Sequence, residues 1–148
     1  MVVTISRTGY IKRNPITLYN SQKRGGKGKM AMGTKEDDFV EHLFVASTHH
    51  MFLFFTNMGK VYWSKVYELP MASRTSKGRA IVNFLNFDKD EKLTTVLAVP
   101  SFEEGKNIVM ATKNGLVKKT DLMAYSRPRL GGIIAIDVVP GDELVTAR

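Results

Sequence analysis

The sequence contains no cysteine, which excludes disulfides and thiolate metal sites and favours a reducing compartment. It also has no uninterrupted apolar run near the roughly 20 residues that a membrane-spanning helix needs. The first ten residues, MVVTISRTGY, lack the charged and apolar regions of a secretion signal. We therefore expect a soluble, cytoplasmic chain that does not enter a membrane.

Groupings of side chains that carry out catalysis or hold a metal are also missing. No Ser, His and Asp arrangement, carboxylate pair or metal-ligating cluster stands out. The segment GKGKMA (residues 26–31) fits a dinucleotide-binding pattern formally, but a basic loop precedes it where that site needs a strand. The sequence thus predicts no catalytic residue, no metal site and no cofactor.

What the chain has in excess is positive charge. Its 148 residues suffice for one domain with a core, and 43% of them are hydrophobic. Its 22 Lys and Arg residues exceed its 14 Asp and Glu residues, which leaves a net charge of +8. An anionic partner, such as nucleic acid or an acidic membrane surface, suits this excess.

The chain repeats itself about every 50 residues. Each repeat begins with an apolar run, a polar turn ending in glycine, a second run and a basic residue or pair. The turn glycines are Gly9, Gly59 and Gly115, and a second block in each repeat carries Gly28, Gly78 or Gly132. We expect the repeats at approximately 1–50, 51–106 and 107–148 of a single domain.

Each repeat is expected to hold about four short strands. Residues 52–56 and 60–63 are rich in aromatic and β-branched side chains between turn signals. Residues 36–46 fit a helix or a strand, but their counterpart 91–99 is strand-like, so we expect strands in both. Four-stranded units must stack on neighbours to cover both faces, which predicts an all-β, propeller-like domain. Three such blades make only part of the usual ring, so we expect a fragment, an open array or half of a dimeric ring.

The positive charge is concentrated in one part of each repeat. Residues 7–29, 59–79 and 113–132 hold 17 of the 22 Lys and Arg residues but only 2 of the 14 acidic residues. Repetition places equivalent segments on equivalent surfaces, so we expect a basic stripe, which suits a long anionic polymer. No helix presents Asn, Gln and Arg at major-groove spacing, so the expected contacts are to the phosphate backbone.

One short motif resembles a known family. The segment QKRGGKG (residues 22–28) is similar to the gyrase A box, Q-R-R-G-G-K-G, of the C-terminal domain of DNA gyrase A. Lys23 stands where that family has Arg, which keeps the charge but loses the planar fork of a guanidinium. The segments TISRTGYIKR, FFTNMGKVYW, SKGRAIVN and ATKNGLVKKT also resemble the family, in the same order.

The resemblance implies a β-pinwheel, a propeller-like disc of normally six blades with strands exchanged between neighbours. It implies sequence-nonspecific wrapping of double-stranded DNA around a basic rim, in support of negative supercoiling. The ATP-dependent and DNA-cleaving steps of this type IIA topoisomerase lie elsewhere, so the domain itself is not an enzyme. The implied partners are double-stranded DNA, the rest of gyrase A, and gyrase B.

The residues expected to contact DNA are those of the box, implied by the resemblance, and the basic residues of the three repeats. They are Lys12, Arg13, Gln22, Lys23, Arg24, Gly25, Gly26, Lys27, Gly28, Lys29, Lys60, Lys65, Arg74, Lys77, Arg79, Lys118, Lys119, Arg127 and Arg129. We expect Lys12, Arg13 and their equivalents to give affinity and the box to fix the path of the DNA.

Two alternatives remain open. The C-terminal domain of topoisomerase IV shares the blades but has a degraded box, whereas the box here is nearly intact. A propeller-like module whose basic rim binds acidic proteins is the alternative from another functional class.

Overall fold

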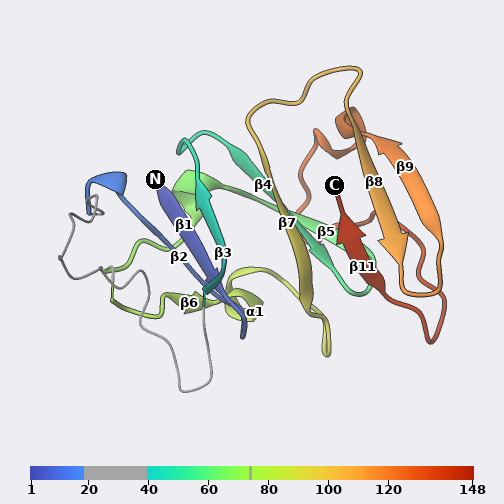
Figure 1. Cartoon of the computed structure of the whole chain (residues 1–148), viewed down its shortest axis with the longest axis horizontal. Coiled ribbons are helices and arrows are strands. Elements are labelled where there is room, and N and C mark those ends of the chain that lie inside the picture. The colour runs from blue at the N-terminus through green and yellow to red at the C-terminus, as the bar shows by residue number, and fades with distance from the viewer. Residues whose placement is uncertain (19–39, 74) are drawn as a thin grey trace, which may run out of the picture. The chain divides into compact units, whose positions relative to one another are not determined.

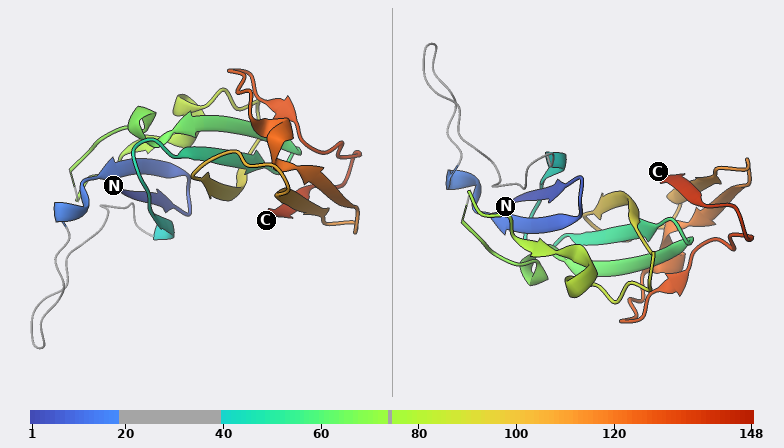
Figure 2. Two further views of the ribbon diagram at one scale, coloured as in Figure 1. Left: turned by 90° about the horizontal axis from the view of Figure 1, so that it is seen from above. Right: turned by 90° about the horizontal axis from the view of Figure 1, so that it is seen from below.

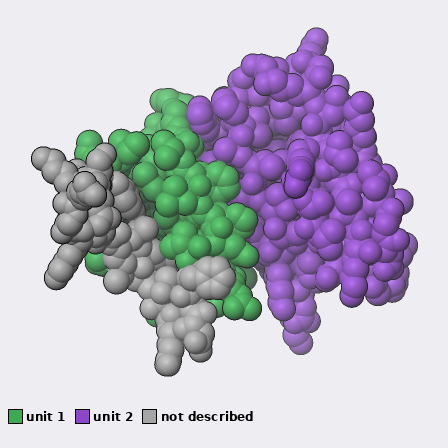
Figure 3. Space-filling model, viewed as in Figure 1, with its two compact units in different colours: residues 1–49, 66–84 green, residues 50–65, 85–148 purple. Residues whose placement is uncertain are grey.

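The structure, a computed structural model, describes residues 1–18, 40–73 and 75–148. The predicted box, Lys29 and Arg74 lie outside these residues. The described chain is built almost entirely of strands, with one α-helix of four residues (Figure 1). Its contacts divide it into two compact units, residues 1–49 with 66–84 and residues 50–65 with 85–148 (Figure 3).

The first unit contains one antiparallel sheet with strand order β3-β1-β2-β6. Its strands are β1 (Val2–Ser6), β2 (Tyr10–Asn14), β3 (Val40–Val45) and β6 (Arg79–Ala80). The short helices η1 (Ile16–Leu18), η2 (Val66–Glu68) and α1 (Ile81–Phe84) accompany it. The hairpin of β1 and β2 turns at Gly9, which has the positive φ of 90° that favours glycine.

The second unit contains two antiparallel sheets, with strand orders β10-β5-β4-β7 and β11-β8-β9. The first sheet consists of β4 (Met51–Thr56), β5 (Lys60–Lys65), β7 (Leu93–Val99) and β10 (Ile133–Ile134). The second consists of β8 (Asn107–Thr112), β9 (Val117–Asp121) and β11 (Leu144–Ala147), and η3 (Leu122–Tyr125) follows β9. Strands β4 and β5 lie side by side in both views of Figure 2.

These strands confirm the all-β prediction. Strands β4 and β5 cover the predicted strands 52–56 and 60–63, and every residue of β4 is buried. The uncertain segment 36–46 contains β3, and its counterpart 91–99 contains β7, so both are strands where the structure describes them. All three turn glycines have positive φ, as tight hairpins require.

Strands are exchanged between successive repeats. Strand β6 belongs to the second repeat but pairs with β2 of the first, with Tyr10 opposite Ala80. Strand β10 belongs to the third repeat but pairs with β5 of the second, with Val61 opposite Ile133. This exchange is what the resemblance implied. The third sheet has three strands and not the expected four within the described chain, because that chain holds no fourth repeat to supply the remaining one.

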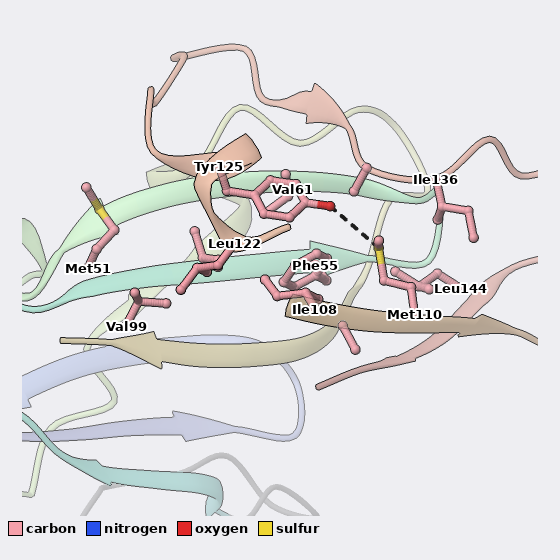
Figure 4. Packing of buried hydrophobic residues seen from close by; sticks show 13 residues of the cluster. Met51, Phe55, Val61, Val99, Ile108, Met110, Leu122, Tyr125, Ile136 and Leu144 are labelled. Carbon is pink, nitrogen blue, oxygen red and sulfur yellow. Dashed lines mark hydrogen bonds between the residues drawn. The ribbon is translucent and has the colours of Figure 1, made fainter. Parts of the chain in front are cut away.

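The core of the second unit joins its two sheets (Figure 4). Phe55 from β4 and Tyr125 from η3 meet edge to face, with ring centroids 6.1 Å apart. The Tyr125 hydroxyl points at the sulfur of Met110 from β8, 3.9 Å away. Burial raises the pKa of Tyr125. Each such side chain contributes roughly 1.5–3 kcal/mol through burial, so the third repeat is fastened to the second mainly by apolar packing.

Candidate nucleic-acid interface

Six of the basic residues predicted to contact DNA are exposed. They are Lys77 and Arg79 in the first unit and Lys118, Lys119, Arg127 and Arg129 in the second. None of them forms an ion pair with an acidic residue that the structure describes. These six side chains therefore offer accessible positive charge to an anionic ligand.

Arg127 and Arg129 line an open hollow in the second unit. Its other lining residues are Met123, Ala124, Ser126, Gly132, Ile133 and Ile134. The chain forms this hollow by turning twice, with Ser126 N donating to the Met123 carbonyl at 3.1 Å and Gly132 N to the Arg129 carbonyl at 3.0 Å. Two guanidinium groups beside polar and apolar surface suit the phosphate and sugar of a nucleic-acid backbone.

Gly132 sets how closely this loop approaches β5. Its φ is 70°, and a Cβ built on it would lie 2.9 Å from both the Val61 carbonyl oxygen and the Tyr62 ring. A larger residue would push the loop off the strand. The glycine therefore fixes the place of Arg129, three residues before it.

Lys60 is half-buried and its charge is already engaged. Its ammonium lies 3.5 Å from the Asp88 carboxylate and 5.2 Å from the centre of the Tyr62 ring. The hydrogen bond with Tyr62 is the largest cause that raises the pKa of Lys60, ahead of the opposing effect of burial. Because Asp88 partly neutralises it, Lys60 offers less charge to a ligand than the six exposed residues. Lys65, at the end of the same strand, is also half-buried.

Lys12 departs from the prediction. Its side chain is fully buried, with 0% exposed. The ammonium donates hydrogen bonds to the carbonyls of Ser73 and Ser76, both at 2.9 Å. An ion bound in this way inside the protein is out of reach of a phosphate, so the structure does not support a DNA contact by Lys12.

Arg13 is half-buried and bonded to the same stretch of chain. Its Nε donates to the Leu69 carbonyl at 2.8 Å and its Nη2 to the Tyr67 carbonyl at 3.0 Å. Two of its five donors are therefore used within the protein. Sequence reasoning gave Lys12 and Arg13 a role in affinity because they are cationic, but strand β2 directs both toward backbone carbonyls.

Two exposed cations of the basic segments 7–29 and 113–132 were left out of the predicted site. Arg7 and Lys113 lie in the turns of the β1–β2 and β8–β9 hairpins. Each stands two residues before the turn glycine, Gly9 or Gly115. Alignment of the repeats on these glycines would have found them as a pair.

Two other kinds of site are absent from the part of the chain that the structure describes. Among the described residues, no group of three or more His, Asp or Glu side chains could hold a metal ion. Within the same residues, no helix has the length and apolar character needed to cross a bilayer.

Comparison with known families gives a match along the whole chain. The family described as "DNA gyrase C-terminal domain, beta-propeller" matches residues 1–47, 50–100 and 106–148. DNA gyrase A of Salmonella typhimurium is 52% identical over 98% of this chain and 16% of that protein. DNA gyrase A of Mycolicibacterium smegmatis is 52% identical over 99% of this chain and 17% of that protein. The chain therefore spans a small part of these relatives.

Solved structures agree on the fold. The C-terminal domain of DNA topoisomerase IV matches with a TM-score of 0.84 and 28% identity, over 99% of this chain and 44% of that one. The DNA gyrase A C-terminal domain matches with a TM-score of 0.73 and 22% identity, over 99% of this chain and 46% of that one. At 22% identity the second comparison supports the fold alone.

Proposed function

Because this chain belongs to the family of DNA gyrase C-terminal domains, we propose that it binds double-stranded DNA through its exposed Lys and Arg residues and bends the DNA into a wrap. In the full-length protein this wrap supports negative supercoiling by gyrase. The partners are then double-stranded DNA, the remainder of gyrase A, and gyrase B, in the cytoplasm. The chain itself contributes no catalytic step and takes no cofactor.

The observation that carries the proposal is the set of six exposed basic residues, Lys77, Arg79, Lys118, Lys119, Arg127 and Arg129. They come from the second and third repeats, in segments where the sequence holds few acidic residues. A metabolite would need one enclosed pocket with converging polar groups, whereas separate exposed cations suit a polymer of regularly spaced phosphates.

Contacts of this kind are insensitive to base sequence. The only α-helix in the described chain, α1, has four residues and carries no Arg, Lys or Gln. Recognition of bases in the major groove uses an inserted helix or ribbon with such side chains. We therefore expect phosphate contacts and bending to dominate, as in proteins that wrap DNA without base-specific contacts.

The gyrase role is favoured over that of topoisomerase IV by the box. The segment QKRGGKG keeps six of the seven family residues at positions 22–28. The relatives named as DNA gyrase are 48–52% identical to the chain. The solved topoisomerase IV domain, at 28% identity, shares the fold with less of the sequence.

A gel shift with DNA circles tests the proposal. The chain is titrated onto a nicked circle, the nick is ligated while the chain is bound, and the linking number is read after the protein is removed. A dose-dependent change in linking number supports wrapping. A shift without such a change would leave DNA binding but remove the wrap, and no shift at low salt would remove the function and favour an acidic protein partner.

A further inference from the structure

Three successive residues of β2 hold a segment of the next repeat. Arg13 bonds to the carbonyls of Tyr67 and Leu69, as described above. The Asn14 side-chain amide donates to the Ala72 carbonyl, and the Lys12 ammonium donates further along the segment. Successive side chains of a strand point to opposite faces, so the segment is held from both faces of β2.

The Lys12 contacts fix one turn of this segment. The Ser73 carbonyl accepts from the Lys12 ammonium at 2.9 Å, from Ser76 N at 3.2 Å and from Ser76 Oγ at 3.0 Å. The Ser76 carbonyl accepts from the same ammonium at 2.9 Å. A buried cation is costly unless its hydrogen bonds are made, so the lysine and the turn depend on each other. We call the turn that Ser73 and Ser76 close the clamped turn.

The chain after the clamped turn stays against β2. Gly78 has a φ of 83°, and a Cβ on it would overlap the Ile11 carbonyl oxygen and lie 2.8 Å from the Lys12 Cβ. Strand β6 then begins at Arg79, opposite Ile11. The backbone is therefore fixed on both sides of Lys77, whose exposed side chain places its ammonium 5.8 Å from the centre of the Tyr10 ring.

The clamped turn belongs to the basic segment SRTSKGR, residues 73–79. In the sequence Arg74 lies between the two serines that accept from Lys12, and Lys77 follows directly. A basic loop that is ordered before DNA arrives loses less conformational entropy on binding than one that must be ordered by the DNA.

We propose that Lys12 is a positioning residue for DNA binding, which fixes the clamped turn so that Lys77 meets a phosphate while Lys12 itself touches no DNA. This inference rests on the proposed function. It gives a buried lysine an effect on DNA affinity that acts entirely through its neighbours.

The equivalent positions in the other repeats differ. Each equivalent position lies three residues after the turn glycine, as Lys12 does after Gly9. In the second repeat this position is Tyr62, whose hydroxyl donates hydrogen bonds to Glu91 and to the Asn86 carbonyl. Lys118 occupies it in the third repeat, where it is exposed and donates to the Ala135 carbonyl at 3.1 Å. Lys118 is thus a matched control, a lysine at the same place that is open to solvent.

The decisive experiment measures the salt dependence of duplex DNA binding in four proteins. These are the unaltered chain, Lys12→Met, Lys77→Ala, and both substitutions together. Each lost phosphate contact makes the slope of log K against log salt less steep by about 0.9. If Lys12 acts through the clamped turn, then Lys12→Met removes up to about one contact and the double variant is no worse than Lys77→Ala.

Hydrogen exchange of the free chain tests the clamp without DNA. Lys12→Met should speed exchange at the amides of Ser76 and Lys77 relative to β4, which lies in the other unit. Lys118→Met should leave those amides unchanged and remove about one contact from the salt slope. If Lys12→Met does not fold, Lys12→Gln, which keeps a neutral donor, takes its place.

Chemical rescue separates the ammonium from general packing. The chain has no cysteine, so Lys12→Cys creates a single thiol that can be alkylated in denaturant before refolding. Aminoethylation restores a lysine-like ammonium and should restore both exchange protection and the salt slope. Carbamidomethylation, which adds a neutral group, should not restore the slope.

Three results would overturn the proposal. Additive losses in the double variant would mean that Lys12 contacts phosphate directly. An unchanged slope in Lys12→Met would mean that the clamp does not serve DNA binding, and unchanged exchange would mean that there is no clamp. If the unaltered chain does not bind DNA, the proposed function is wrong. The hydrogen-exchange data then still show whether Lys12 fixes the clamped turn.

Discussion

The two junctions between successive repeats share their backbone pairing but use different side chains. In the first unit, Ile81 N donates to the Gly9 carbonyl at 2.7 Å where the second repeat joins the first. In the second unit, Ala135 N donates to the Gly59 carbonyl at 2.8 Å where the third repeat joins the second. Each contact places an incoming strand on the same edge of the preceding hairpin.

The side chains at these junctions differ in chemistry. Four residues after the turn glycine, Arg13 donates to the Leu69 carbonyl in the first junction and Trp63 to the Tyr125 carbonyl in the second, both at 2.8 Å. An arginine and a tryptophan thus satisfy the same kind of acceptor. The junction requires an N–H donor at this place and not a charge, so a cation in β2 is poor evidence for a DNA contact.

The largest expected effect comes from the glycines that let the repeats approach. A Cβ at Gly59 would overlap the Ile136 carbonyl oxygen, and one at Gly78 would overlap the Ile11 carbonyl oxygen. Both contacts are with backbone and both residues have positive φ, so Gly59→Ala and Gly78→Ala should each destabilise their unit by at least about 3 kcal/mol. Urea unfolding followed by circular dichroism measures the loss.

Gly141→Ala is the control for the strain of positive φ alone. Gly141 has a φ of 86° but no atom within 4 Å of a built Cβ, so we expect a loss of about 1 kcal/mol. Equal losses of stability at Gly141, Gly59 and Gly78 would show that the close approach of the repeats adds no further cost to the substitution. The two junctions would then not share a requirement for glycine at a close contact.

A middle-sized effect is expected from the donors at the two junctions. Trp63→Phe leaves the Tyr125 carbonyl without its donor, and Arg13→Met does the same to the Leu69 carbonyl and to the more exposed Tyr67 carbonyl. Each substitution should cost about 1–2 kcal/mol in its unit. Similar losses of stability would support the view that the two side chains stabilise their junctions in the same way, by donating a hydrogen bond. A loss confined to Trp63→Phe would show that the aromatic packing, and not the hydrogen bond, holds the second junction.

The smallest effect concerns pH and the hairpin turns of the second unit. Glu91 and Asp142 each stand two residues before the strand that pairs with the hairpin, and Glu91 accepts from the Thr56 hydroxyl at 2.6 Å. Burial acts to raise the pKa of Asp142, but hydrogen bonds from Thr112, Asn114 N and Glu143 N together hold the pKa below its usual value. A depressed pKa means that its contribution to stability is present above about pH 4 and is lost as the pH falls through the lowered pKa.

Asp142→Asn should therefore lower the stability slightly at about pH 7 and make unfolding less sensitive to pH below about 4, because the amide does not titrate. Thermal unfolding of both proteins across this range measures the difference. Parallel pH profiles for the two proteins would show that the pKa of Asp142 is the same in the folded and the unfolded state.

The sequence predicted what depends on local pattern. Strands β4 and β5 follow from dense aromatic and β-branched residues, and the hairpins follow from Gly9, Gly59 and Gly115. Strands β6 and β10 have two residues each and lie in basic or glycine-rich segments, so no alternation marks them. Their pairing with the preceding repeat came from the family resemblance, because only the approach of another repeat creates it.

The site was predicted less completely than the fold. Exposed cations such as Arg127 and Arg129 were found from charge segregation. The burial of Lys12 was not predicted, because lysine is rarely buried and its residue type alone argues against a buried position. One signal was present: in the aligned repeats Lys12 stands where the second repeat has Tyr62, a buried aromatic residue. The box could not be compared, because it lies outside the described residues.

The central claim is that exposed cations, and not buried ones such as Lys12, bind DNA phosphates. The most direct measurement is the salt dependence of duplex DNA affinity for the unaltered chain and for Arg127→Gln with Arg129→Gln. If the six exposed cations each contact a phosphate, they alone give a slope of log K against log salt of about −5, and the double variant should be less steep by about two. An affinity that is insensitive to salt, or a double variant with the slope of the unaltered chain, would contradict the claim.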